Sequence, residues 1–243
     1  MTTIVTKDTS KRIVKDIQQL KRDPIDGIYY SHDDTSILKG YAMIIGPEHT
    51  PYEGGYYLFK IDFSYDYPHS PPVFTFCTND GFTRMHPNMY KNGKVCLSIL
   101  NTWNGEPWTA CQTLSSILVT LRSILTEDPL SHEPGIRKLH EEKELYTFII
   151  EYKNISLSML DVIIQETYLK EFNPLIQIAR QDFINHFNTK LKILNKNSKK
   201  LRETISISEP VICTCIYKLT CKISYDALEQ KMHQTYDTLT KKN

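Results

Sequence analysis

One of the six cysteines, Cys96, is the residue most suited to nucleophilic chemistry. It lies in MHPNMYKNGKVCLSIL (85–100), after a turn-rich segment and before an apolar run. A cysteine attacks as the thiolate, so it needs access to its substrate and either a base or a partner that requires none. A cysteine in such a place is, on composition alone, more often a small buried hydrophobic residue. The surrounding residues must decide between these two interpretations.

Two side chains near Cys96 offer partners for such chemistry. His86 lies ten residues upstream, and a Cys/His pair would suit a hydrolase, although most chains contain such a pair somewhere. Asn88 carries an amide that could donate to an oxyanion, but asparagine is also common in turns. The motif His86-Pro87-Asn88 followed eight residues later by Cys96 is more specific than any of its parts.

A long irregular segment must position these residues. Residues 79–108 are polar and punctuated by Gly, Asn and Pro. A loop of this length inside a compact domain is usually functional or disordered. Tyr90, Trp103 and Trp108 argue against disorder, so the segment is predicted to be a functional loop.

Strands are predicted before this loop and helices on both sides of it. The aromatic and β-branched runs at 37–46, 56–63 and 72–78 are separated by short turns, which predicts an antiparallel meander of about four strands. Ser10 is predicted to cap a helix that runs to about Arg22. The run at 112–125 has the pattern of a buried helix.

The C-terminal part is predicted to be mainly helical. The helical patterns cover 136–152, 155–202 and 225–240, with a β-rich stretch at 205–226. Strands followed by helices indicate an α+β protein.

Composition restricts the partners and the setting. The formal net charge of +1 gives no reason to expect a nucleic-acid or membrane partner, and the N-terminus lacks the apolar core of a signal peptide. Six cysteines without an export signal favour a reduced, intracellular chain. Cys213, Cys215, Cys221 and His233 lack the paired spacing of a zinc ribbon, so neither a metal nor a cofactor is expected.

The blocks on either side of Cys96 together resemble the ubiquitin-conjugating enzymes. The resemblance runs through SKRIVKDIQQLKRDP, PYEGGYYLFKIDF, DYPHSPPVFTF, HPNMYKNGKVCLSIL and QTLSSILVTLRSILTEDP, and covers about residues 8–150 in family order. TEDPLSHEPG and the long C-terminal part are most similar to the larger Z-type branch, which works with the alternative activating enzyme and carries a C-terminal extension.

The resemblance implies a fold and an activity. The fold would be an α+β conjugating-enzyme core at 8–155, with an N-terminal helix, a four-stranded antiparallel meander, an active-site loop and C-terminal helices. Residues 156–243 would form a mainly helical extension. Cys96 would accept ubiquitin or a ubiquitin-like protein as a thioester from an ATP-dependent activating enzyme and transfer it to a substrate lysine. The expected location is the cytoplasm or the nucleus.

The resemblance also implies roles for individual residues near Cys96. Asn88 would stabilise the oxyanion or prop the loop, and His86 and Pro87 would support the same loop. Ser98 stands where many relatives have an aspartate, which removes one negative charge near the thioester.

A carboxylate near the cysteine would orient or deprotonate the attacking lysine. Glu133 before Pro134 is the chosen candidate, with His132 as the competing position. A solvated carboxylate beside a turn is the alternative explanation for Glu133.

Two partner surfaces follow from the resemblance. The contact with the activating enzyme would be made by Lys11, Arg12 and Lys15. The contact with a ubiquitin ligase would be made by His69, Ser70, Thr109 and Ala110. Many ligase-binding relatives carry an aromatic residue and a proline where this chain has His69 and Ala110, which disfavours the common RING-ligase mode.

Two other functions stay open on the sequence. One is a non-catalytic module that keeps the fold to bind ubiquitin or a ligase. The other is a cysteine hydrolase that uses Cys96 and His86.

Overall fold

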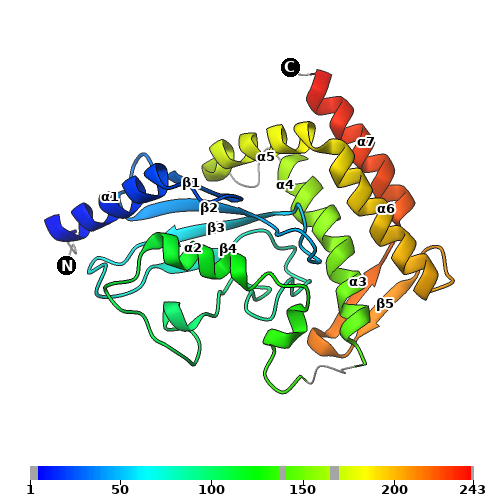
Figure 1. Cartoon of the computed structure of the whole chain (residues 1–243), viewed down its shortest axis with the longest axis horizontal. Coiled ribbons are helices and arrows are strands. Elements are labelled where there is room, and N and C mark those ends of the chain that lie inside the picture. Colours follow the sequence, from blue (N-terminus) through cyan, green and yellow to red (C-terminus); the bar gives the residue numbers. More distant parts are fainter. Residues whose placement is uncertain (1–4, 137–140, 165–169, 242–243) are drawn as a thin grey trace.

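A four-stranded antiparallel sheet is the layer on which the first helices pack (Figure 1). In the computed structural model, which describes residues 5–136, 141–164 and 170–241, the sheet has the order β1-β2-β3-β4. Its strands are β1 (Ile28–His32), β2 (Lys39–Ile45), β3 (Tyr56–Asp62) and β4 (Val73–Phe76). Each strand pairs with the next along the chain, with Met43 opposite Leu58 in the centre. The predicted α+β meander is therefore confirmed.

The edge strand β1 had no individual prediction. Its sequence, IYYSH, is short, and only its first residue is fully buried. The strand pairs on one side only, with β2, so its residues need no continuous apolar pattern. Gly27, just before it, adopts a left-handed φ of 70°, a conformation that glycine adopts without steric cost.

The N-terminal helix begins earlier than predicted. Helix α1 (Lys7–Arg22) is capped by Thr6, whose side chain accepts a hydrogen bond from the Thr9 amide at 3.1 Å. Ser10 lies inside the helix and its hydroxyl donates to the Thr6 carbonyl at 3.2 Å, so the prediction of Ser10 as the cap was wrong. Thr6 followed by Asp8 in the first turn is the better start signal, because a carboxylate there complements the helix dipole.

A buried carboxylate joins α1 to the rest of the core. Asp16, which is 2% exposed, accepts a hydrogen bond from Arg12 Nε at 2.9 Å and another from the Tyr67 hydroxyl. It also accepts one from the Leu114 amide, at the start of α2 (Leu114–Ser123), at 3.2 Å. A buried charge is tolerated when its oxygens are paired in this way. We call this group of contacts the Asp16 anchor.

A long helical run leads from the core into the C-terminal part. Helix α3 (Lys143–Lys153) continues as a π-helical segment, η3 (Asn154–Asp161), and then as α4 (Val162–Ile164). At the start of η3, Asn154 accepts a hydrogen bond from the Tyr57 hydroxyl at 2.6 Å and donates to the Glu53 carbonyl at 2.9 Å. The domain boundary predicted at 155/156 lies within this run.

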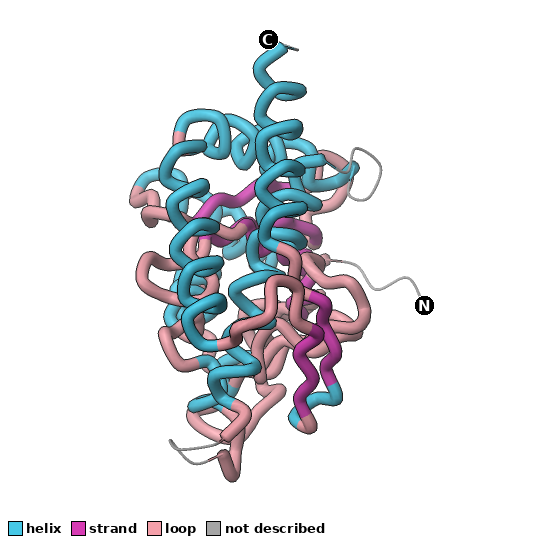
Figure 2. The backbone as a smooth tube through the Cα atoms, turned by 90° about the vertical axis from the view of Figure 1, so that its right-hand side faces the viewer, coloured by secondary structure: helices cyan, strands magenta, loops and turns pink. Residues whose placement is uncertain are grey.

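The remaining elements form three helices and a hairpin. They are α5 (Asn173–Asn185), α6 (Phe187–Thr204), β5 (Val211–Thr214), β6 (Leu219–Lys222) and α7 (Tyr225–Lys241). Strands β5 and β6 form a separate two-stranded antiparallel sheet within the predicted β-rich stretch, seen as the pair of magenta tube segments at the lower right of Figure 2. Short 3-10 turns complete the described chain: η1 (Ser98–Leu100), η2 (Pro129–His132), η4 (Lys170–Phe172) and η5 (Ile216–Lys218).

Within the described residues, no helix combines the length and the apolar character that a membrane crossing requires. The same residues contain no cluster of three or more His, Cys, Asp or Glu side chains that could hold a metal ion.

Candidate active site

Cys96 is held in place by a reciprocal pair of hydrogen bonds with Asn88. The Cys96 amide donates to the Asn88 carbonyl at 2.9 Å, and the Asn88 side-chain amide donates to the Cys96 carbonyl at 2.7 Å. The eight-residue spacing follows from a tight reversal between them, where Met89 bridges Val95 and Gly93 adopts a φ of 86°. The backbone that carries the thiol is therefore fixed by both the main chain and the side chain of Asn88.

In the side-chain amide of Asn88, the nitrogen makes a hydrogen bond and the oxygen makes none with the described residues. Its nitrogen is on the Cys96 carbonyl, which props the loop. Its Oδ1 atom is buried and accepts no hydrogen bond from the described residues. The geometry thus gives Asn88 the loop-propping role, while its contact with an oxyanion stays a prediction.

His86 is a fully buried brace for the same loop. Its Nδ1 accepts a hydrogen bond from the backbone N–H of Asn88 at 3.0 Å, and its Nε2 faces the Ile124 carbonyl at 2.9 Å. Burial, together with the nearby His132 and Arg84, lowers the pKa of His86 to about 3, so the ring is neutral at physiological pH. A neutral ring with a proton on Nε2 satisfies both contacts.

These contacts bear on the hydrolase alternative. Both ring nitrogens of His86 are engaged with backbone groups, and neither contact is with Cys96. A general base for a cysteine nucleophile must reach the thiol by a hydrogen bond. The arrangement does not support a Cys96–His86 hydrolase pair.

The neighbouring residues pack closely around the Cys96 segment. Pro87 is buried, and its carbonyl accepts a hydrogen bond from the Arg84 guanidinium. Ser98 begins η1 and is partly buried. A Cβ on Gly105 would lie 3.0 Å from the Ser98 Cβ, so the following loop passes directly against Ser98.

The cysteine itself is 2% exposed, although the loop that follows it, 101–107, is exposed throughout. Cys96 is thus almost fully covered in this structure.

Glu133 and His132 point to different neighbours. The His132 ring lies 5.1 Å from the His86 ring, centroid to centroid, and its Nε2 lies 3.2 Å from the Thr126 hydroxyl. The Glu133 carboxylate instead accepts a hydrogen bond from the hydroxyl of Tyr217. Of the two residues considered for the acidic role near Cys96, Glu133 is the one with a carboxylate. That carboxylate is hydrogen-bonded to Tyr217 of the C-terminal hairpin.

Tyr217 and the residues around it were not identified from the sequence. The Tyr217 carbonyl accepts a hydrogen bond from Lys91 Nζ at 3.0 Å, and its ring lies 4.5 Å from the Arg84 guanidinium. These contacts join residues more than 80 positions apart, and no local pattern predicts such pairing. We call Cys215–Lys218, the turn that joins β5 to β6, the hairpin tip.

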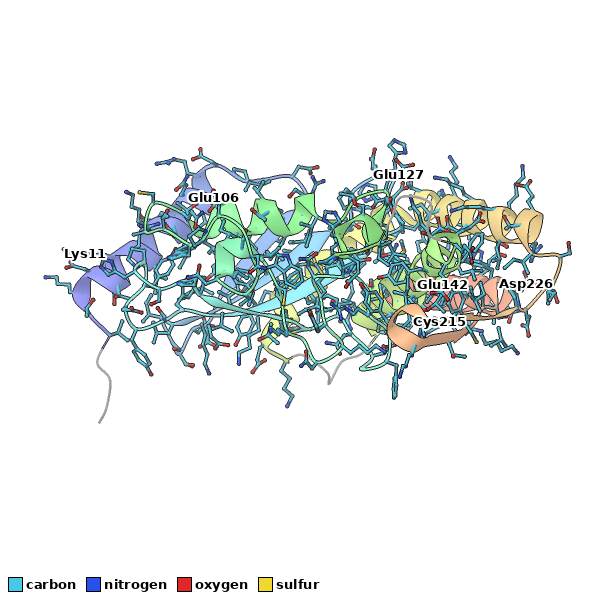
Figure 3. All side chains as sticks on the ribbon, turned by 90° about the horizontal axis from the view of Figure 1, so that it is seen from below. Lys11, Glu106, Glu127, Glu142, Cys215 and Asp226 are labelled. Carbon is cyan, nitrogen blue, oxygen red and sulfur yellow. The ribbon has the colours of Figure 1, made fainter. Side chains whose placement is uncertain are left out.

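A second carboxylate fixes the hairpin tip to the start of α3. The Glu142 carboxylate accepts hydrogen bonds from the Cys215 amide at 2.6 Å and from the Ile216 amide at 2.9 Å. Figure 3 shows Glu142 and Cys215 side by side, far from Lys11 at one end of the molecule. We call these two bonds the Glu142 anchor.

The predicted surface for an activating enzyme is only partly free. Lys11 and Lys15 are exposed on α1. Arg12 is used internally, because it bonds to Asp16, to the Ala110 carbonyl at 2.8 Å and to the Gln112 carbonyl. An activating-enzyme contact on this face would therefore be made chiefly by the two lysines.

The two loops predicted to contact a ligase lie together. The Trp108 indole donates to the Pro68 carbonyl at 2.7 Å and links them. His69, Thr109 and Ala110 are exposed, whereas the Ser70 hydroxyl is engaged with Asp66 at 2.7 Å.

Comparison with known proteins identifies relatives of this architecture. The family model described as ubiquitin-conjugating enzyme matches residues 12–152. The chain is 35% identical to human ubiquitin-conjugating enzyme E2 Z over 180 residues, which are 73% of this chain and 50% of that protein. It is 31% identical to ubiquitin-conjugating enzyme E2 3 of Arabidopsis thaliana over 145 residues, 58% of this chain and 91% of that protein.

A solved structure of human ubiquitin-conjugating enzyme E2 G1 is 32% identical, covers 50% of this chain and 98% of its own, and has a TM-score of 0.44. The chain spans about half the length of the E2 Z relatives that it matches. The resemblance to the Z-type branch is confirmed. The chain belongs to the ubiquitin-conjugating enzyme family.

Proposed function

We propose that this protein carries ubiquitin or a ubiquitin-like protein as a thioester on Cys96 and transfers it to a substrate lysine. The observation that carries the proposal is the reciprocal hydrogen-bond pair between Asn88 and Cys96. It fixes the backbone of a cysteine without providing a general base, which suits a thiol whose acyl group comes from another thioester. Membership in the conjugating-enzyme family supports the same activity.

Loading is an exchange between two thioesters. The Cys96 sulfur forms a bond to the modifier's terminal carbonyl carbon, and the bond from that carbon to the activating enzyme's sulfur breaks. The proton lost by Cys96 balances the proton gained by the departing thiol. One C–S bond replaces another, so the step needs little driving force.

Transfer replaces the thioester by an amide. The lysine nitrogen bonds to the carbonyl carbon, the bond from that carbon to Cys96 breaks, and the proton lost by the amine restores the thiol. Glu133 would accept a hydrogen bond from the incoming amine, and the Asn88 amide would face the oxyanion. Removal of one oxyanion donor typically slows such a reaction by about two to three orders of magnitude.

The partners of this reaction are proposed from the same surfaces. Lys11 and Lys15 would meet the activating enzyme, and the loops at His69 and Thr109 would meet a ligase. The reaction would take place in the cytoplasm or the nucleus.

The test is Cys96→Ser, incubated with activating enzyme, ATP and a panel of modifiers. Wild-type protein is expected to form an adduct that dithiothreitol removes, and Cys96→Ser is expected to form none. Cys111→Ser is the matched control, because Cys111 is also a free thiol but is exposed. A dithiothreitol-sensitive adduct on Cys96→Ser at the wild-type rate would refute the proposal.

A second candidate is a non-catalytic module that binds the modifier or a ligase. The observation that favours it is the 2% exposure of Cys96. It predicts that wild-type protein binds the modifier but forms no reducible adduct with any activating enzyme.

A further inference from the structure

The hairpin tip is held in an unfavourable backbone conformation beside the candidate site. Tyr217 and Lys218 have φ values of 58° and 51°, in the left-handed region that residues other than glycine rarely adopt. Such conformations persist only when surrounding contacts impose them, and they occur often at functional sites. The contacts that impose this backbone conformation are the two backbone-amide hydrogen bonds of the Glu142 anchor and the hydrogen bond from Lys91 to the Tyr217 carbonyl.

The conformation directs the Tyr217 hydroxyl at Glu133. The hydroxyl donates to Oε2 of the carboxylate, and no described residue donates a hydrogen bond to Oε1. Burial and the Glu133 charge raise the pKa of Tyr217, so the phenol stays a protonated donor at physiological pH. One carboxylate oxygen is thus fixed while the other can accept a hydrogen bond from an incoming group.

The Tyr217 ring connects the same carboxylate to the segment that carries the cysteine. Arg84 lies between the rings of Tyr217 and Tyr90, at 4.5 Å and 3.6 Å from their centroids. Its guanidinium donates to the carbonyl of Pro87, the residue before Asn88. The hairpin tip, Glu133 and the Cys96 loop therefore form one connected set of contacts.

We propose that Tyr217 is a positioning residue for transfer, which holds the Glu133 carboxylate where the lysine amine arrives. The proposal rests on the proposed function, because it assigns Tyr217 to the second step of that reaction. It makes the C-terminal hairpin part of the amine-receiving side of the site. Loading of Cys96 does not involve an amine and does not require Tyr217.

The variant that tests this role is Tyr217→Phe, which removes the hydroxyl and keeps the ring against Arg84 and Tyr146. Two rates are measured on the same preparation: formation of the Cys96 thioester, and its single-turnover discharge to free lysine. Loading is expected to be unchanged. Discharge is expected to fall about tenfold at low lysine, through a higher apparent KM for lysine, as for the loss of one hydrogen bond to a charged group.

The matched control is Tyr225→Phe. Tyr225 is a second tyrosine of the C-terminal part; it is buried, whereas Tyr217 is half-buried, and its hydroxyl makes no hydrogen bond with the described residues. This variant is expected to load and discharge as wild type does.

The double variant Tyr217→Phe/Glu133→Gln tests whether Tyr217 acts through Glu133. If it does, the double variant discharges no more slowly than Glu133→Gln alone, because residues in one network are not additive. Independent, multiplied defects would overturn the proposal.

The outcomes separate this inference from the proposed function. Wild-type protein that never loads would refute the thioester function itself. Wild-type protein that loads and discharges, with Tyr217→Phe within twofold of it in discharge, would refute the role of Tyr217 alone. A loading defect in Tyr217→Phe equal to its discharge defect would also overturn the role, because it would show a general effect on the fold.

Discussion

The two carboxylate anchors hold different parts of the molecule by different means. At the Asp16 anchor, a buried side chain collects donors from α1, from the loop after β3 and from the start of α2, all within the part that matches the family. At the Glu142 anchor, a half-buried side chain at the start of α3 accepts two backbone amides from the hairpin tip, which lies outside that part.

The difference separates contacts that join elements of the core from contacts that attach the C-terminal hairpin to the core. The contacts of the Asp16 anchor all lie within the core. They include Arg12, which had been predicted to contact an activating enzyme. The Glu142 anchor attaches a separate element whose tip reaches Glu133. We therefore expect loss of the first anchor to reduce global stability, and loss of the second to release the hairpin.

The largest effect is expected for Asp16→Ala. The substitution leaves the Arg12 guanidinium and the Tyr67 hydroxyl without their buried acceptor. Breaking such a buried charged network typically costs about 3 kcal/mol or more. Urea denaturation measures the free energy of unfolding, with Asp23→Ala as the control because Asp23 forms an exposed pair with Arg22. A loss no greater than that of the control would remove the distinction between the anchors.

The pH dependence of stability tests His86, the buried brace of the Cys96 loop. His86 has a pKa of about 3 when folded, against 6.5 for an ordinary histidine. Between these values the unfolded chain binds a proton that the folded chain does not. The contribution of neutral His86 is therefore fully present above about pH 6.5, falls as the pH drops, and levels off below about pH 3. The slope is at most about 1.4 kcal/mol per pH unit.

Urea denaturation from pH 7 to pH 4 measures this slope. His86→Asn is expected to lose that share of the slope, and His69→Asn, a change on the exposed surface, is expected to keep it. Parallel curves for wild type and His86→Asn would contradict a buried neutral ring.

The smallest effect is expected for Glu142→Gln. A glutamine offers one carbonyl oxygen for two amides, so one of the two hydrogen bonds from the hairpin tip is lost. The expected local cost is about 1 kcal/mol. Hydrogen exchange at the Cys215 and Ile216 amides is expected to accelerate about fivefold, with little change in global unfolding. Glu144→Gln, in the same helical turn but exposed, is the control, and equal exchange in the two variants would argue against the anchor.

Much of the fold could be predicted because its signals are local. The aromatic strands, the turns between them and the buried helix α2 follow from the periodicity of neighbouring residues. The start of α1 was misplaced because Ser10 is also an acceptable cap by residue type, although Thr6 with Asp8 in the first turn is the stronger sequence signal and makes the capping contact. Strand β1 is an edge strand with weak alternation, so its residues gave no strong signal.

The candidate site also contains some contacts that the sequence could predict and others that it could not. Asn88 and Cys96 are eight residues apart and meet through one tight reversal, so their spacing already suggested a common unit. Tyr217 meets Glu133 across 84 positions, which depends on the whole path of the C-terminal helices. The buried state of Cys96 also depends on the packed tertiary structure rather than on its neighbours in sequence.

The π-helical segment Asn154–Asp161 determines how the helices after it are rotated, about the axis of this helical run, relative to the core. Its first residue is fixed on Tyr57 and Glu53, and its last, Asp161, is paired with Lys231 of α7 at 2.7 Å. Each residue of a helix turns the chain by about a quarter of a turn, so deleting one residue within η3 would rotate the following face by about that amount. Asp161 would then point away from Lys231. The segment is thus less tolerant of changes in length than of changes in side chain, because the number of its residues determines the direction in which Asp161 points.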